Sequence, residues 1–286
     1  MINKPISYGR QYISDEDIQA VVDTLKSDYL TCGPAIPAFE KAFSEYVHCK
    51  YAVAVNNATS ALHLAAIALG VKPGDNVICT PMTFASSANC IRFCGGNVKF
   101  VDINPKTYLL DLDKLKETLE SAPKGTYKGM VLVDFAGYPH NMEEYRKVAD
   151  EYGMWILEDA CHAPGAFFID STGEKVFCGS GKYSDITVFS FHPVKHITTG
   201  EGGMACTQNK EYYEKMALYR THGITHDVDK LQRKDGLWYY EMQELGYNYR
   251  ITDIQAALGT SQLKRARKNV EIRRELVRKY NEAFTD

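Results

Sequence analysis

The chain has no CxxC pair among its eight cysteines, no excess of positive charge and no long apolar run. Scattered cysteines argue against a disulfide framework and favour reduced thiols in a cytoplasmic protein. A formal net charge of −3 over 286 residues gives no bulk attraction to nucleic acid or to an anionic membrane. No apolar run approaches the ~20 residues of a membrane span, and the N-terminus lacks the apolar core of a signal peptide. We therefore expect a cytoplasmic globular protein without nucleic-acid or membrane partners.

Several ligand-binding motifs are also missing. There is no Walker lysine and no GxGxxG pattern, which disfavours a nucleoside triphosphate or a dinucleotide as ligand. Cys161 and His162 have no second spaced pair, and His192 and His196 lack a nearby acidic ligand motif. These spacings do not match a metal site, so we predict no bound metal.

Strand-like and helix-like runs alternate along the first two thirds of the chain. The apolar runs predict strands at residues 51–55, 76–80, 98–103, 130–135 and 154–157, with helices at 37–47, 59–69, 84–93, 112–120 and 142–152. Such alternation is typical of an α/β fold with a mostly parallel sheet. Two closely spaced strands, 187–191 and 203–207, indicate that the sheet is mixed.

The C-terminal part of the sequence has a different pattern. From Thr252 onward it reads as one long helix, with apolar positions from Ile254 to Tyr280. We therefore expect residues 1–250 to form a large domain and residues 251–286 to form a long connecting helix.

The segment from Val53 to Leu62 reads as a strand that runs into a helix through small and hydroxyl residues. Free amides at a helix N-terminus, together with the hydroxyls of Thr59 and Ser60, suit a phosphate group. Simple capping of the helix by Asn57 or Thr59 is the alternative.

Two acidic residues, Glu158 and Asp159, stand at the C-terminal end of a predicted buried strand, with His162 three residues further on. Ligand sites of open α/β sheets lie at those strand ends. An aspartate in that place can be kept ionised by a cationic partner such as a protonated pyridine nitrogen. The alternative is a carboxylate that only caps the following turn.

An aromatic residue and a lysine complete a set of candidate site residues. Phe84 follows a strand and can offer its face to a flat ring, although a core phenylalanine is the simpler interpretation. Lys195 lies on a loop after another strand, where a partly desolvated pocket would lower its pKa and make it a nucleophile. A solvated loop lysine is the alternative. Together, a phosphate site, an aromatic face, an aspartate and a lysine match pyridoxal 5'-phosphate (PLP), which has a phosphate, a flat ring, a ring nitrogen and an aldehyde.

From about Ile6 to its end, the chain resembles the fold-type I PLP-dependent aminotransferases that act on nucleotide-linked keto-sugars. The motifs that carry the resemblance are Leu30–Pro34, Asn57–Ala61, Pro81–Phe84, Glu158–His162, Ser190–Lys195 and Gly246–Asp253. The resemblance implies a three-layer α/β sandwich with a mostly parallel mixed central sheet. It also implies that a small C-terminal domain is largely missing, because the family continues after the long helix.

The resemblance further implies a role for each matching residue. Lys195 would be the catalytic Schiff-base lysine, Asp159 the partner of the pyridine nitrogen, Phe84 the stacking ring and His162 a neighbour of the phenolic oxygen. Ala58, Thr59 and Ser190 would hold the phosphate, and Asn248 would reach the phosphate of the neighbouring subunit. Shared active sites of this kind imply a homodimer.

Residues 195–203 and 220–224 look most like the enzymes of pseudaminic acid synthesis. The implied reaction is amination at C4 of a UDP-linked 4-keto-6-deoxy-N-acetylhexosamine, with L-glutamate as amino donor. Relatives that aminate UDP-4-keto-arabinose share most motifs, and a non-catalytic PLP-binding protein is a further alternative. The related sugar 3-dehydratases carry histidine instead of the Schiff-base lysine, so Lys195 argues against that reaction. Candidate substrate contacts are Tyr8, Thr31, His192 and His222.

Overall fold

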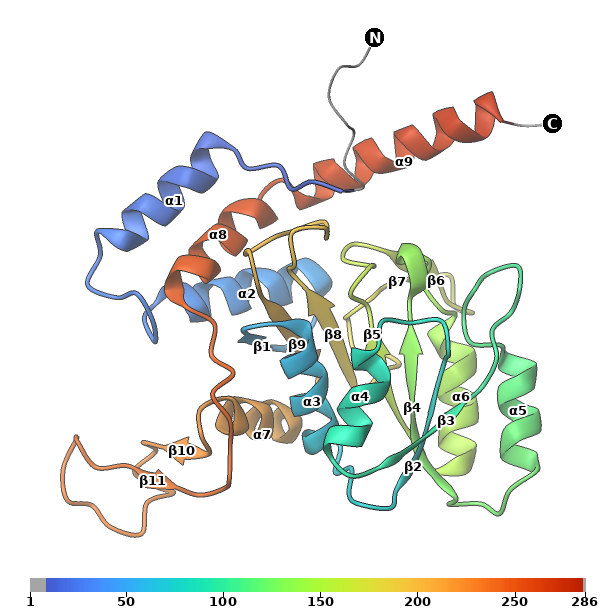
Figure 1. The fold of residues 1–286 in the computed structure, drawn as a ribbon, viewed down its shortest axis with the longest axis horizontal. Helices are drawn as coiled ribbons and strands as arrows, with labels where there is room; N and C mark the ends of the chain where they lie inside the picture. Colours follow the sequence, from blue (N-terminus) through green and yellow to red (C-terminus); the bar gives the residue numbers. More distant parts are fainter. Residues whose placement is uncertain (1–8, 285–286) are drawn as a thin grey trace.

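In the computed structural model, which describes residues 9–284, a central seven-stranded sheet is covered by helices on both faces (Figure 1). The spatial strand order is β1-β9-β8-β5-β4-β2-β3. These strands are β1 (Tyr51–Val55), β2 (Asn76–Cys79), β3 (Asn97–Phe100), β4 (Tyr127–Val133), β5 (Trp155–Asp159), β8 (Ile186–Ser190) and β9 (Gly203–Thr207). Strands β3, β2, β4, β5 and β8 run parallel, and β9 pairs antiparallel with both β8 and β1. The predicted mixed, mostly parallel sheet is confirmed.

The helices divide between the two faces because alternate strand residues point in opposite directions. On one face, Val53 and Val188 pack in a core with α3 (Ala58–Ala68), α4 (Ser86–Phe93) and α7 (Lys210–Arg220). On the other face, Ala54 and Phe189 pack with α2 (Ala35–Val47) and α8 (Asp253–Leu263). Further along the same face, Ile156 packs with α5 (Leu112–Glu120) and α6 (Met142–Tyr152). The result is the expected three-layer sandwich.

The prediction of one long helix from Thr252 is wrong. The chain forms α8 and then α9 (Ala266–Ala283), with a break at Lys264 and Arg265. The Arg265 guanidinium bonds to the buried Asp17 carboxylate and to the carbonyl oxygen of Tyr12. These bonds hold the junction against α1 (Asp15–Leu25) and fix the change in direction. A hydrophobic pattern that continues across both helices contains no sign of this break.

Some elements were not predicted from the sequence. Helices α1 and α7 each bury a single side chain fully, Asp17 and Met216. The apolar pattern of α7 is weak, whereas apolar residues of α1 recur at positions 18, 21, 22 and 25, a helical spacing that could have predicted this helix. Two short hairpins were also missed, β6 (Phe167–Ile169) with β7 (Lys175–Phe177), and β10 (Ile224–Thr225) with β11 (Glu241–Met242). The second hairpin carries an arm that extends away from the sheet (Figure 1). No helix within residues 9–284 is long and apolar enough to cross a membrane.

Candidate active site

The candidate site lies where the C-terminal ends of β5 and β8 meet the N-terminal ends of α3 and α4. Asp159 is the last residue of β5 and Ser190 is the last residue of β8. Asp159 lies on the same face as Leu157, which packs in the core under α3 and α4, whereas Glu158 faces the opposite side. The strand ends of a parallel sheet are the usual place for a ligand.

The start of α3 forms a cradle of backbone amides. The Oδ1 atom of Asn57 caps this helix and accepts the N–H of Ser60 at 2.8 Å. Because first-turn N–H groups have no intrahelical partner, those of Ala58 and Thr59 stay available to a ligand. This geometry therefore fits both alternatives, the capping of α3 by Asn57 and a phosphate site at its first amides.

Gly203 brings Ser190 next to this cradle. Gly203 is on β9, where it pairs with Ser190 of β8 on one side and with Val55 of β1 on the other. A Cβ atom on Gly203 would lie 2.6 Å from the carbonyl carbon and oxygen of Asn57 and 2.7 Å from the amide nitrogen of Ala58. Only glycine lets the strand approach the helix so closely, and the contact aligns Ser190 with the free amides.

The Gly203→Ala variant should lose stability, by about 1–3 kcal/mol, because the new methyl group must displace backbone atoms of the capped helix. It should also weaken binding of inorganic phosphate and PLP. Urea denaturation and ligand titration measure the two effects. Gly9→Ala is a suitable control, because the φ of Gly9 is not in the left-handed region and its Cβ would make only ordinary contact with Val194, at 3.6 Å. Unchanged stability and unchanged phosphate binding in the Gly203 variant would contradict the proposed tight approach.

Asp159 is held by two hydrogen bonds. Its Oδ2 atom accepts the hydroxyl of Ser87 at 2.6 Å, and its Oδ1 atom accepts the N–H of Cys161 at 3.2 Å. Thr83 Oγ1 lies 2.7 Å from Ser87 Oγ and extends this network. The carboxylate is buried, so its orientation is fixed. The sequence did not single out Ser87, because one serine at the start of a helix resembles any other.

His162 and Lys195 lie near this carboxylate, and the carbonyl oxygen of Phe84 accepts the N–H of Ser87, whose hydroxyl binds the carboxylate. The side chain of Phe84, just before α4, is 76% exposed, which leaves an aromatic face available to a flat ligand. The Nδ1 atom of His162 accepts the N–H of Ala136 at 3.2 Å. Burial, together with the charge of Lys195, lowers the pKa of His162. Lys195 is partly buried, and its backbone N–H closes a turn with His192 at 2.9 Å.

The other predicted contacts lie at the surface. Thr31, His192, His222 and Asn248 are all exposed, and Tyr8 falls outside the described residues. Asn248 directly precedes Tyr249, whose carbonyl oxygen accepts the N–H of Asn56 at 2.9 Å. This segment therefore runs past the start of α3 in its own chain. His222 has a positive φ of 61°, which marks a tight turn after α7.

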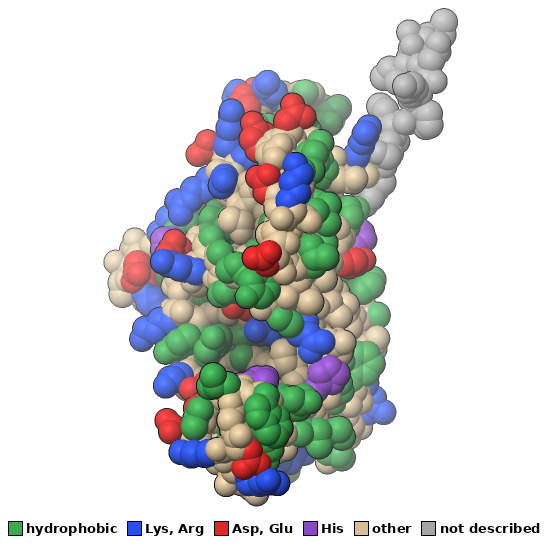
Figure 2. Space-filling model, turned by 90° about the vertical axis from the view of Figure 1, so that its left-hand side faces the viewer, with side chains coloured by type: hydrophobic (Ala, Val, Ile, Leu, Met, Phe, Trp, Pro, Cys, Tyr) green, Lys and Arg blue, Asp and Glu red, His purple; other side chains and the backbone are tan. Residues whose placement is uncertain are grey.

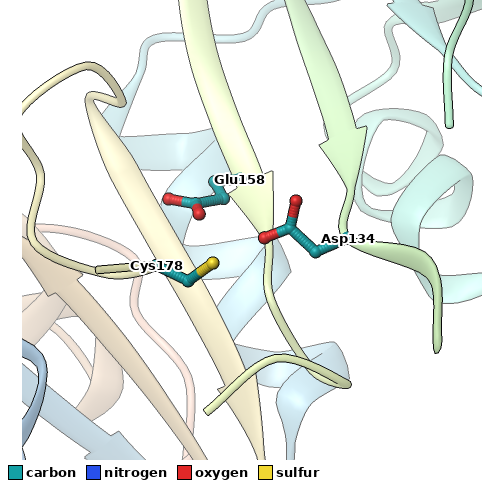
Figure 3. Close-up of side chains that lie close together, drawn as sticks. All are labelled: Asp134, Glu158 and Cys178. Carbon is teal, nitrogen blue, oxygen red and sulfur yellow. The ribbon is translucent and has the colours of Figure 1, made fainter. Parts of the chain in front are cut away.

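A second group of polar side chains is buried on the opposite face of the sheet. The side chains of Asp134, Glu158 and Cys178 converge there. A carboxylate oxygen of each acid and the Sγ atom of the cysteine lie within 4.8 Å of one another (Figure 3). Glu158 accepts hydroxyls of Ser184 and Thr187 at 2.9 and 2.6 Å. Burial, reinforced by the neighbouring carboxylate charge, raises the pKa of Glu158 to about 8. A retained proton on Glu158 limits the charge repulsion between these buried carboxyl groups.

The Glu158→Gln variant should be stabilised relative to the wild type as the pH rises. The unfolded chain loses this proton near pH 4.5, whereas the folded chain keeps it to about pH 8. Within that window the unfolded state binds fewer protons, so the free energy of unfolding of the wild type falls with rising pH. The glutamine amide does not titrate, so the free energy of unfolding of the variant should not fall in this way. Relative to the wild type, it should rise by at least ~1 kcal/mol between about pH 5 and about pH 8.

Urea denaturation at both pH values tests this expectation. The exposed Glu120→Gln change on α5 provides a control for loss of one carboxylate. Parallel pH dependences for the wild type and Glu158→Gln would show that Glu158 holds no proton in this range.

Comparison with known proteins identifies the class to which this fold and site belong. The sheet and the residues at its strand ends are those of an aminotransferase. The chain belongs to the DegT/DnrJ/EryC1/StrS aminotransferase family, whose sequence pattern matches residues 11–286. This family depends on PLP, and its relatives include nucleotide-sugar aminotransferases.

Three relatives illustrate the similarity. The UDP-4-amino-4,6-dideoxy-N-acetyl-beta-L-altrosamine transaminase of Campylobacter jejuni (strain 81-176) is 40% identical over 280 residues, which cover 98% of this chain and 69% of that protein. PseC of Helicobacter pylori, an aminotransferase of pseudaminic acid biosynthesis, superposes with a TM-score of 0.86 at 32% identity, covering 99% of this chain and 71% of PseC. The PLP form of a sugar aminotransferase from Streptococcus pneumoniae gives 0.83 at 30% identity, over 98% and 72% of the two chains. The chain therefore spans about 70% of the length of these relatives.

Proposed function

We propose that this chain catalyses the PLP-dependent transamination of a nucleotide-linked 4-keto-6-deoxy sugar. The proposed substrate is a UDP-linked N-acetylhexosamine, and the proposed amino donor is L-glutamate. The observation that carries the proposal is the convergence of Asp159, Ser190 and the start of α3 at the strand ends next to Lys195. The names of the Campylobacter and Helicobacter relatives support this sugar class. A cytoplasmic location is proposed from the isolated cysteines of the sequence.

The residues present fit PLP. Amides of Ala58 and Thr59, with the hydroxyl of Ser190, suit its phosphate, and the exposed ring of Phe84 suits its flat face. The buried carboxylate of Asp159 can accept a hydrogen bond from a protonated ring nitrogen. The Ser87 hydroxyl and the Cys161 N–H orient this carboxylate toward such a partner. Bound PLP supplies an electron sink for the carbanion that forms when a substrate proton leaves.

Each residue has a distinct task in this scheme. The amine of Lys195 would hold the cofactor, and it would carry a proton to and from the reacting carbon of the substrate. Asp159 holds the ring nitrogen protonated, and the Ser87 hydroxyl and the Cys161 amide hold Asp159 in place. This fixed charge needs no reorganisation during the reaction, which makes electrostatic stabilisation effective. His162 borders the same space.

A homodimer with shared sites is part of the proposal, and the exposed arm around β10 and β11 supports it. Leu237, Trp238 and Leu245 on this arm are 100%, 72% and 80% exposed. Figure 2 shows hydrophobic side chains gathered on the lower part of the side where Figure 1 places the arm. Exposed apolar groups of this kind mark association surfaces. Asn248 lies at the base of the same arm and is proposed to serve the neighbouring subunit.

Incubation of the purified protein with PLP and L-glutamate tests the first half of the reaction. A working enzyme converts the bound cofactor to its pyridoxamine form, followed by the change in its absorption spectrum, whereas a non-catalytic PLP-binding protein leaves it unchanged. A panel of UDP-4-keto-sugars then separates the hexosamine from UDP-4-keto-arabinose. Thr31, His192 and His222, with Tyr8, are the proposed sugar contacts to vary if one substrate is preferred.

A further inference from the structure

A cationic cavity opens beside Lys195. It has a volume of about 340 Å³ and lies between the loop after β8, the N-terminal segment and α9. This volume falls within the range of about 300–1,000 Å³ that is usual for small-molecule sites. The lining contains Arg10, Lys195 and Arg273 but no aspartate or glutamate. The cavity is therefore suited to an anion.

The two arginines are not used elsewhere in the fold. Neither Arg10 nor Arg273 forms an ion pair or a side-chain hydrogen bond with any residue in 9–284. By contrast, Arg265, which lies between α8 and α9, is fully engaged with Asp17 and Tyr12. A guanidinium offers five donors in a rigid fork that matches a carboxylate or a phosphate. Both side chains are exposed, so each guanidinium is free to pair with an anion that enters the cavity.

His196 gives independent support for a missing partner. It lines the same cavity, and its Nδ1 atom is buried without a hydrogen-bond partner among the described residues. Burial, together with the charges of Arg273, His162 and Lys195, lowers the pKa of His196 to about 4. Near neutral pH this imidazole is uncharged, so it adds no further positive charge beside Arg273 and Lys195. Buried polar atoms are rarely left unpaired, which points to a polar group of a ligand.

We propose that Arg10 and Arg273 form the subsite for the carboxylate groups of the amino donor, a dicarboxylic amino acid. This inference rests on the proposed transamination at Lys195. The carboxylates of such a donor lie only one and three bonds from its reacting carbon, so they must sit close to Lys195. In a sugar that reacts at C4, the diphosphate on C1 lies across the ring and further from the reacting atom. The position of the arginines therefore favours the donor over the nucleotide, although both ligands are anionic.

Calorimetric titration with glutarate and with UDP distinguishes the two anions without requiring turnover. Glutarate represents the dicarboxylic donor, and UDP represents the diphosphate of the acceptor. Arg10→Gln and Arg273→Gln should each weaken glutarate binding at least about tenfold, because charge-assisted bonds to a carboxylate are lost. UDP binding should change by less than about threefold. Arg278→Gln is the matched control, since Arg278 lies on the same helix but pairs with Glu275 and Glu282 outside the cavity.

In the first half-reaction, the same variants should raise the half-saturating concentration of L-glutamate with a smaller effect on the limiting rate. Wild-type protein that does not bind glutarate, or variants that lose UDP binding instead, would overturn the donor subsite. Failure of the proposed function is a separate result, because it appears as wild-type protein that binds glutarate but does not convert bound PLP with any amino acid.

Discussion

The Lys195→Ala variant is expected to lose transamination activity at least about a thousandfold while it keeps its fold. Among residues 9–284, Lys195 is the one lysine that lines the cavity, so no described neighbour can both attach the cofactor and shuttle a proton. Within residues 9–284 the lysine side chain makes no ion pair or hydrogen bond, so its removal should not disturb packing. Steady-state turnover, the visible absorbance of bound cofactor and thermal unfolding measure the three consequences.

Lys114→Ala serves as the control, since Lys114 is an exposed lysine on α5, far along the chain from the site. Full turnover by Lys195→Ala would remove this residue from the mechanism. Loss of turnover together with a much lower unfolding temperature would instead show that the lysine stabilises the loop, and the catalytic assignment would then be withdrawn.

The second large effect is expected for Asp159→Asn, with a fall in kcat of at least about a hundredfold. The amide keeps the size of the side chain and can still accept the Ser87 hydroxyl, but it lacks the charge that holds a proton on the ring nitrogen. Ser87→Ala keeps that charge and removes one hydrogen bond at 2.6 Å. It should therefore cost only about tenfold, as expected for loss of an orienting contact.

Glu158→Gln provides a stringent control at about neutral pH. Glu158 is the neighbouring acid on the same strand, but it points to the opposite face of the sheet. A fall in kcat as large as that of Asp159→Asn would show that the two carboxyls act as one unit. Equal activity of wild type and Asp159→Asn would contradict the role given to Asp159.

The periodicity of the sequence predicted the central sheet well, because most of its strands carry a short apolar run and most of the covering helices have an apolar face. The gathering of Asp159 and Ser190 was also predictable in principle, since the carboxyl ends of parallel strands share one edge. Ser87 and Arg273 were not predictable in this way. Their importance depends on which helix end meets the strand ends, and this is set by tertiary packing. The same limit explains the helix break at Arg265, which depends on a partner near the N-terminus.

The antiparallel pairing of β1 with β9 sets an order of events during synthesis on the ribosome. The helix that follows β1 is made early, but Gly203, which completes the cradle at its start, is made after most of the sheet. Until β9 emerges, β1 has no paired strand, and Gly203 does not yet lie against the start of α3. Nascent chains that end before residue 203 should therefore be unable to retain PLP, so cofactor capture is a late step in the maturation of this protein.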